Sequence, residues 1–100
     1  MDTYTFQQKI ERIERITPAI HMNGSGYDNL MAGLRAQWEA IDGAIKTMAA
    51  NGPHMRDFYV FVDGVKRFDA ANDAHVARMS ALVVAKDEIM AIIDNLNSHA

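Results

Sequence analysis

The 100-residue sequence contains no cysteine, which excludes disulfide bridges and thiolate metal sites and favours a reducing, cytoplasmic compartment. No apolar run approaches the roughly 20 residues that a membrane-spanning helix needs, and no signal-peptide pattern opens the chain. The net charge is −3, and no basic stripe is present, so we expect neither a nucleic-acid nor a membrane partner. The length corresponds to a single domain, residues 1–100.

Catalytic and metal-binding patterns are also missing. No carboxylates are paired at a spacing suited to acid–base catalysis, and none of the three serines stands in a nucleophile elbow. Histidines at helical metal-ligand spacing would share one helix face, and the four in this chain do not. We therefore expect no enzymatic activity, no metal and no cofactor.

In two long segments, residues 27–50 and 65–96, mostly apolar residues recur at alternating spacings of three and four, which is typical of helices packed side by side. The first segment stops at Asn51-Gly52-Pro53, because glycine is favoured just past a helix end and proline cannot continue a helix. The first stripe consists of Tyr27, Met31, Leu34, Trp38, Ile41, Ile45 and Met48. The second consists of Val65, Phe68, Asn72, His75, Met79, Leu82, Lys86, Ile89, Ile93 and Leu96.

These stripes predict an all-α fold, an antiparallel helical hairpin preceded by a short N-terminal helix. A turn centred near residues 56–57 would pair Trp38 with His75 and Tyr27 with Lys86, and the longer helix would overhang at its C-terminal end. Two helices alone leave half of each stripe in water, so we expect a homo-oligomer to complete the bundle.

The N-terminal segment has two interpretations. Phe6, Ile10, Ile13 and Ile16 follow a helical spacing that predicts a helix over about residues 4–16, ended by Thr17-Pro18. The alternative places part of residues 3–22 in a strand.

Two short clusters are candidates for ligand binding. Asn23 and Ser25 precede the helix at 27–50, where they can cap it or, with the neighbouring glycines, offer amides to an anion. The cluster that contains Arg56, Asp57 and Tyr59 combines a planar donor with an aromatic face, which suits a nucleotide base or phosphate. In the structural alternative, Asp57 pairs with Arg56 or caps a turn, and the aromatic residues plug the end of the bundle.

Other residues point to an interface. The run from Phe58 to Val62 is apolar and β-prone, so it must be buried in this chain or against a partner. We expect Phe58, Phe61, Trp38 and His75 at an interface. Asn72 and His75 lie one turn apart within the stripe, where they either line a polar pocket or fix the helix register.

Several of these residues resemble a family of small, uncharacterised helical proteins of phages and mobile elements. The shared features are Met22-Asn23-Gly24-Ser25 before a helix, Asn51-Gly52, and the turn Arg56-Asp57-Phe58-Tyr59 before a second long helix. The chain departs from the family pattern by the insertion Pro53-His54-Met55 and by Phe58 in place of tyrosine. The resemblance implies a phage or prophage origin and a site of action in the host cytoplasm.

The resemblance and the lack of a catalytic constellation together suggest a non-enzymatic accessory protein that counters host defence by binding. Its target would be a small nucleotide-derived signal held between protomers. The alternative is a helical interaction module that docks on a host or phage protein and blocks it.

Overall fold

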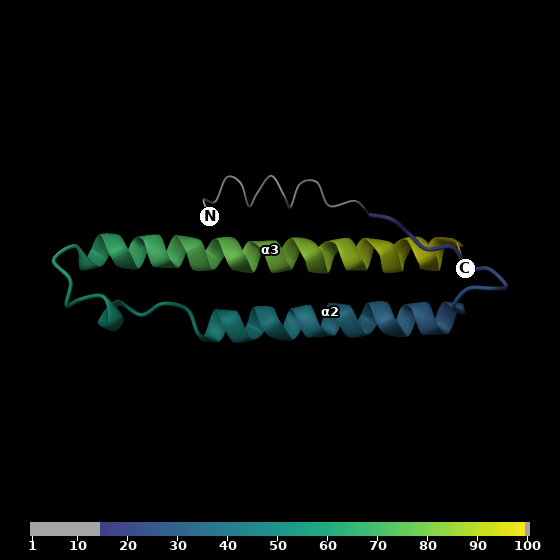
Figure 1. The fold of residues 1–100 in the computed structure, drawn as a ribbon, viewed down its shortest axis with the longest axis horizontal. Coiled ribbons are helices and arrows are strands. Elements are labelled where there is room, and N and C mark those ends of the chain that lie inside the picture. The colour runs from purple at the N-terminus through teal and green to yellow at the C-terminus, as the bar shows by residue number, and fades with distance from the viewer. Residues whose placement is uncertain (1–14, 100) are drawn as a thin grey trace.

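The computed structural model describes residues 15–99, which form an antiparallel pair of long helices (Figure 1). Helix α2 spans Tyr27–Ala50 and helix α3 spans Gly64–His99, with a single turn of 3-10 helix, η1, at Met55–Asp57 between them. Within residues 15–99 there is no strand. The predicted all-α helical hairpin is therefore confirmed.

The predicted N-terminal helix, residues 4–16, lies outside the described residues except for its last two positions. Those two and the chain up to His21 have no regular secondary structure. The strand alternative for residues 3–22 fails from residue 15 onward, because that part of the segment contains no strand.

The ends of α2 lie where glycine and proline interrupt helical geometry. Gly26 has extended dihedral angles, φ −67° and ψ 162°, and precedes the first helical residue. After Ala50, the Asn51 amide donates to the Met48 carbonyl at 3.2 Å, and the Asn51 side chain donates to the Thr47 carbonyl at 2.7 Å. Asn51 thus satisfies carbonyls that would otherwise lack partners at the helix end.

The register between the helices differs from the prediction. The ammonium group of Lys86 lies 5.0 Å from the centre of the Trp38 ring, so Trp38 faces Lys86 and not His75, a shift of eleven positions along α3. Tyr27 donates its hydroxyl hydrogen to Asn97, again eleven positions beyond the predicted partner Lys86. The predicted pairing was therefore wrong, and so was the predicted overhang at the C-terminal end of α3.

The cause of the shift is the path of the connector, residues 52–63. Instead of turning tightly at the end of α2, the connector runs back along the first turns of α3, which project beyond α2 (Figure 1). The Phe58 and Phe68 rings meet edge to face, with centroids 6.0 Å apart. The overhang is therefore at the loop end, where the connector covers it.

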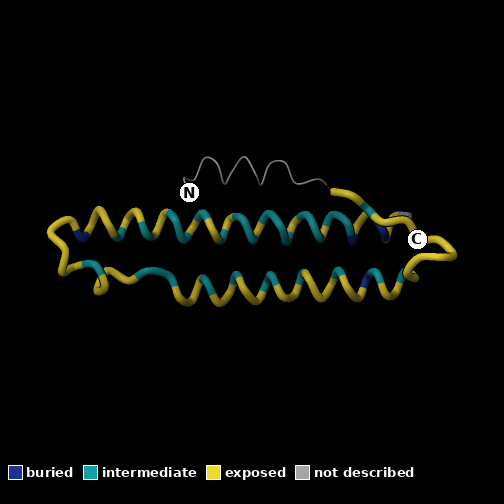
Figure 2. Tube along the Cα trace, in the orientation of Figure 1, coloured by how far each residue is buried: buried dark blue, intermediate teal, exposed yellow. Residues whose placement is uncertain are grey.

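The core is small and lies at the end of the hairpin opposite the connector (Figure 2). Among the described residues, the buried hydrophobic side chains are Met31, Ile93 and Leu96. The partly buried residues packed against them are Tyr27, Leu30, Leu34, Ile89 and Ile92. Most of the seam between the helices is only half-buried, as expected when two helices pack without a third.

The N-terminal part of the described chain lies along the C-terminal half of α3. Arg15 Nε is 2.8 Å from Glu88 Oε2, and the Asn95 side-chain amide donates to the Thr17 hydroxyl at 3.3 Å. These contacts place residues 15–17 beside α3, away from the side that α2 covers (Figure 1).

The close approach of the connector to α3 predicts an asymmetry between two glycines. A Cβ atom on Gly64 would collide with the Phe58 carbonyl, so Gly64→Ala must move the connector and is expected to destabilise the fold by about 1–3 kcal/mol. At Gly43, inside α2, an added Cβ would meet no atom within 4 Å apart from its chain neighbours and the surrounding helix backbone. Gly43→Ala should stabilise the fold by about 1 kcal/mol through helix propensity. Urea unfolding followed by Trp38 fluorescence measures both, and equal stabilisation by the two substitutions would contradict the packing of the connector.

Candidate functional site

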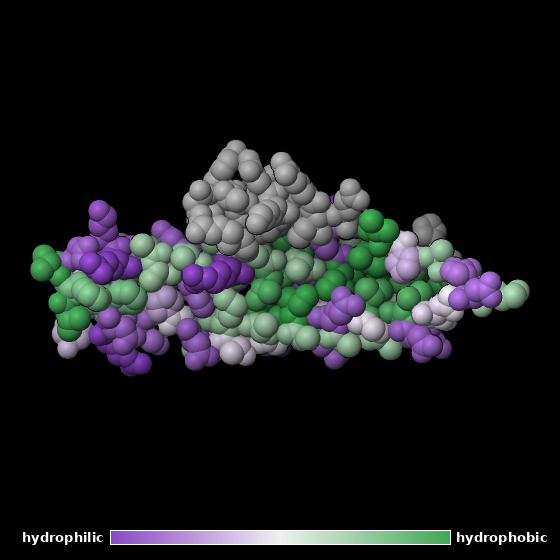
Figure 3. Space-filling model, in the orientation of Figure 1, coloured by the Kyte–Doolittle hydropathy of each residue, from purple (hydrophilic) through white to green (hydrophobic). Residues whose placement is uncertain are grey.

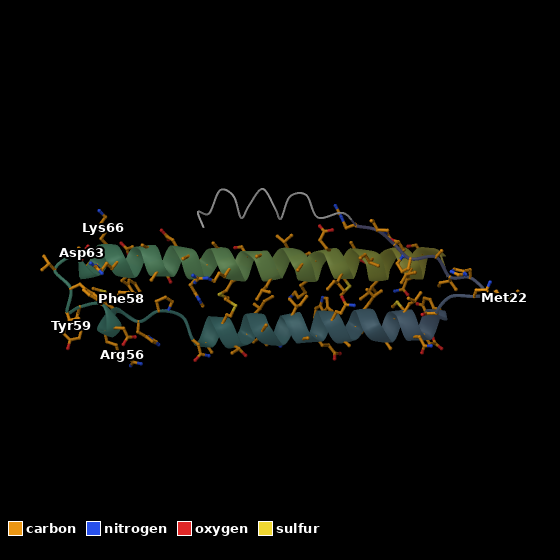
Figure 4. The ribbon with its side chains drawn as sticks, in the orientation of Figure 1. Met22, Arg56, Phe58, Tyr59, Asp63 and Lys66 are labelled. Atoms are coloured by element: carbon orange, nitrogen blue, oxygen red, sulfur yellow. The ribbon has the colours of Figure 1, made fainter. Side chains whose placement is uncertain are left out.

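The two predicted ligand-binding clusters lie at opposite ends of the hairpin. Arg56 and Tyr59 lie at the connector end, whereas Met22, beside Asn23 and Ser25, lies at the other end (Figure 4). The molecule is 64 Å along its longest axis. A single chain therefore does not bring the clusters together, and only an assembly of two chains would.

The residues before α2 do not cap it. Gly26 is the N-cap residue, and no side chain accepts a hydrogen bond from the first turn. Asn23 and Ser25 are exposed in a turn closed by the Gly24 amide, which donates to the His21 carbonyl at 3.2 Å. The predicted capping role was wrong, because this turn ends before the helix and leaves glycine at the N-cap position.

The base of the connector is held by local contacts. Asp57 and Phe58 donate their amides to carbonyls of the preceding turn, at 3.0 and 2.9 Å. Arg67 Nε donates to Asp63 Oδ1 at 2.7 Å, which holds the pKa of that carboxyl below its ordinary value, and the same guanidinium lies 4.3 Å from the centre of the Phe61 ring. The connector is thus attached to α3 at Phe58 and again at Phe61.

The outer part of the connector is apolar and exposed. Tyr59 is 70% exposed and Val60 71% exposed, Val62 is fully exposed, and Phe61 keeps much of its ring in water. Figure 3 shows hydrophobic side chains at this end of the molecule, which Figure 1 identifies as the connector. Of the apolar run that was expected to be buried, only Phe58 is covered within this chain. We call residues 59–62 the connector tip.

A hollow of about 440 Å³ lies under the connector, between the end of α2 and α3. It is lined by Asn51, Gly52, Pro53, Asp57, Phe58, Ala71, Ala74, His75 and Arg78. Asp57, His75 and Arg78 give it both charge signs and an imidazole. Asp57 and His75 were singled out from the sequence, but Arg78 was missed, because its position opposite the connector depends on the helix register.

His75 has a structural partner in this hollow. Its Nε2 lies 2.8 Å from the Met48 carbonyl, which can only accept, so Nε2 donates. The contact ties α3 to the last turn of α2 and helps to fix the register. Asn72 is exposed and does not line the hollow.

Trp38 has its partners within the chain. Asp42 Oδ2 lies 2.9 Å from Lys46 Nζ, and Asp42 Oδ1 accepts from Lys86 Nζ at 3.3 Å. Lys86 also lies over the Trp38 ring, so one ammonium group joins a carboxylate and an aromatic face of α2. The hydrogen bonds from Lys46 and then from Lys86 hold the pKa of the Asp42 carboxyl below its ordinary value of 3.8.

Among the described residues, no three histidine, cysteine, aspartate or glutamate side chains lie close enough together to hold a metal ion. None of their helices is both long enough and apolar enough to cross a bilayer.

The sequence matches no protein-family model, and no curated protein or solved structure matches it significantly.

The Asp42 cluster predicts a pH dependence of stability. Asp42→Asn removes a charge that binds two ammonium groups, so the variant should unfold at lower urea than the wild type near pH 7. Because the folded-state pKa is lowered, this difference should persist down to about the ordinary pKa and disappear as the pH falls through the lowered value. In a background with Lys46→Met and Lys86→Met, Asp42→Asn should have little effect at any pH. A difference that survives in that background would contradict the assignment.

Proposed function

We propose that this chain is a non-enzymatic protein-interaction module that docks on another protein through its connector tip. The observation that carries the proposal is the exposure of Tyr59, Val60 and Val62 in the turns at one end of the helical hairpin. Isolated exposed apolar residues are ordinary, but a contiguous patch of aromatic and β-branched side chains is typical of a binding surface.

The fold supports this role by holding the connector against the first turns of α3. The edge contact between Phe58 and Phe68 anchors the base of the connector, and the bond between Arg67 and Asp63 anchors its far end. A patch anchored on both sides loses little conformational freedom on binding, which favours affinity.

In the setting that the resemblance implies, the chain is a phage or mobile-element accessory protein, and the docked partner is a host defence protein that is blocked by occupancy. No catalytic group is required of the chain for this action.

The test is a photo-crosslinking amino acid at Val62 in the full chain, with the same amino acid at Gln37 on the exposed side of α2 as the matched control. Val62 should crosslink one protein of the host lysate, and the purified protein should then bind the wild-type chain at a fixed stoichiometry. Gln37 should not capture it.

Two substitutions separate apolar docking from polar recognition. Phe61→Asp places a charge in the patch and should weaken binding of the captured protein by about tenfold or more, because the partner would then bury a charge in place of an apolar ring. Arg56→Ala should have a smaller effect, since Arg56 lies outside the tip. If Arg56→Ala proves the more damaging change, or if Val62 and Gln37 capture the same proteins, the proposal fails.

A second candidate function is favoured by the hollow under the connector. Arg78 and Asp57 face it from α3 and from η1, and exposed Arg56 lies next to Asp57. Such a site suits a small anionic ligand with a base, so this candidate is the sequestration of a nucleotide-derived signal, completed between protomers.

Calorimetry against a panel of cyclic nucleotides tests this candidate. Binding should be lost in Arg78→Ala and retained in Arg35→Ala, which removes an arginine from α2 away from the hollow. If none of the nucleotides releases or absorbs heat while light scattering shows an oligomer, sequestration of such a ligand is excluded.

A further inference from the structure

Helix α3 carries a second exposed apolar surface, distinct from the connector tip. Val76, Val83 and Met90 follow one another at seven-residue intervals and are 51%, 40% and 37% exposed. Residues seven positions apart lie on nearly the same side of a helix, so the three form a continuous row. The row continues at its start to Asp69.

A second row lies beside the first on α3, and each of its residues comes four positions after a residue of the first row. It consists of Asp73, Ser80, Asp87 and Asp94, all exposed. Since residues four positions apart are neighbours on a helix surface, each apolar side chain of the first row has a residue of the second row beside it. We call the two rows together the acidic groove.

The surface between and beside these rows is hollowed. Val76, Ser80 and Val83 line a depression of about 380 Å³ together with Met79 and Val84. Met90 and Asp94 line a second one, of about 240 Å³, whose other wall includes Trp38 on α2. The first depression covers residues 76–84 of α3 and is lined mainly by apolar side chains, and the second covers residues 90–97, where α3 faces α2. Of the aspartates in the two rows, Asp94 lines the second depression, and the others lie beside the depressions.

The charge along the groove is of one sign. Its two rows contain four aspartates and neither lysine nor arginine, and none of the four aspartates forms an ion pair with a described residue. Across the second depression, α2 contributes Arg35 and Glu39, whose charges cancel. Among the described residues, therefore, the carboxylates beside this apolar surface have no ion-pair partner.

This charge pattern distinguishes two possible occupants of the acidic groove, a second copy of this chain and a helix of another protein. A second copy seated groove to groove would bring two aspartate rows together, and like charges across an interface oppose association. A helix with apolar residues at heptad spacing, flanked by lysine or arginine, matches both the floor and the carboxylates.

We propose that the acidic groove binds a basic amphipathic helix of a partner protein. This inference concerns a different surface from the connector tip, so each can fail without the other.

The probe is a synthetic amphipathic peptide of about three heptads, with leucine at the apolar positions, lysine at the flanking positions and a fluorescent label. A second peptide carries glutamate in place of lysine. Fluorescence anisotropy with the full chain should show the lysine peptide binding at least about tenfold more tightly than the glutamate peptide, and more weakly as salt rises.

Three variants locate the binding. Val83→Asp should weaken the lysine peptide by about tenfold or more, because it charges the centre of the apolar row. The double variant Asp87→Lys with Asp94→Lys should reverse the preference toward the glutamate peptide. Ala36→Asp, on the exposed side of α2, is the matched control and should change nothing, and circular dichroism checks that each variant stays helical.

The outcomes that overturn the inference are specific. Equal binding of the two peptides, or binding unchanged by Val83→Asp, would show that the groove is not the site. If the wild-type chain is a dimer in light scattering and Val83→Asp makes it a monomer, the occupant is a second copy and the proposal is wrong. Phe61→Asp should leave peptide binding intact, which separates failure here from failure at the connector tip.

Discussion

The packing of two helices of unequal length along one seam is the constraint on which this structure depends. Helix α3 has 36 residues and α2 has 24, so twelve residues of α3 have no counterpart on α2. Polar contacts place this excess at the loop end: Tyr27 binds Asn97 near one end, Lys86 binds Asp42 in the middle, and His75 binds the Met48 carbonyl near the other end. The connector must then run back along the projecting turns of α3.

The exposed surfaces follow from this arrangement. The connector contacts α3 through Phe58 and through Phe61, whose ring lies against Arg67, whereas Tyr59, Val60 and Val62 stay mostly in water. Because α2 covers only one side of α3, the row from Val76 to Met90 stays exposed on another side. A hairpin thus presents more apolar surface for its size than a three-helix bundle would, and such surface favours association with another chain.

The sequence was sufficient to predict the two long helices, α2 and α3, but not their register. The boundaries of α2 coincide with its stop signals at Gly26 and at Asn51-Gly52-Pro53, where backbone chemistry alone ends a helix. The register was not determined, because a stripe with spacings of three and four looks nearly the same after a slide of eleven residues, which is one heptad plus one further step of four. Only specific polar partners break that degeneracy, and the sequence does not show which lysine meets which aspartate.

The same degeneracy explains the outcome for the candidate sites. The cluster of Arg56, Asp57 and Tyr59 is local in sequence, so its place in the connector could be predicted. The entry of Arg78 into the hollow beside Asp57 depends on how far α3 projects past α2, and a prediction with the wrong register cannot find it. The site predicted between protomers stays a prediction, since a straight hairpin places Asn23 and Ser25 at the end opposite Arg56 within one chain.

The distribution of charge links the register to the choice of partner. The register directs Lys86 to Asp42, and local spacing directs Lys46 to Asp42 and Arg67 to Asp63. These cations are thereby occupied, whereas the aspartates of the acidic groove have no such partner among the described residues. At physiological ionic strength screening acts over about 8 Å, so a basic helix approaching the groove meets the nearby carboxylates more strongly than the distant, neutralised pairs. The two rows of the acidic groove contain four aspartates and no lysine or arginine, and this local excess of carboxylates, more than the net charge of −3, is the basis for the basic partner proposed for the groove.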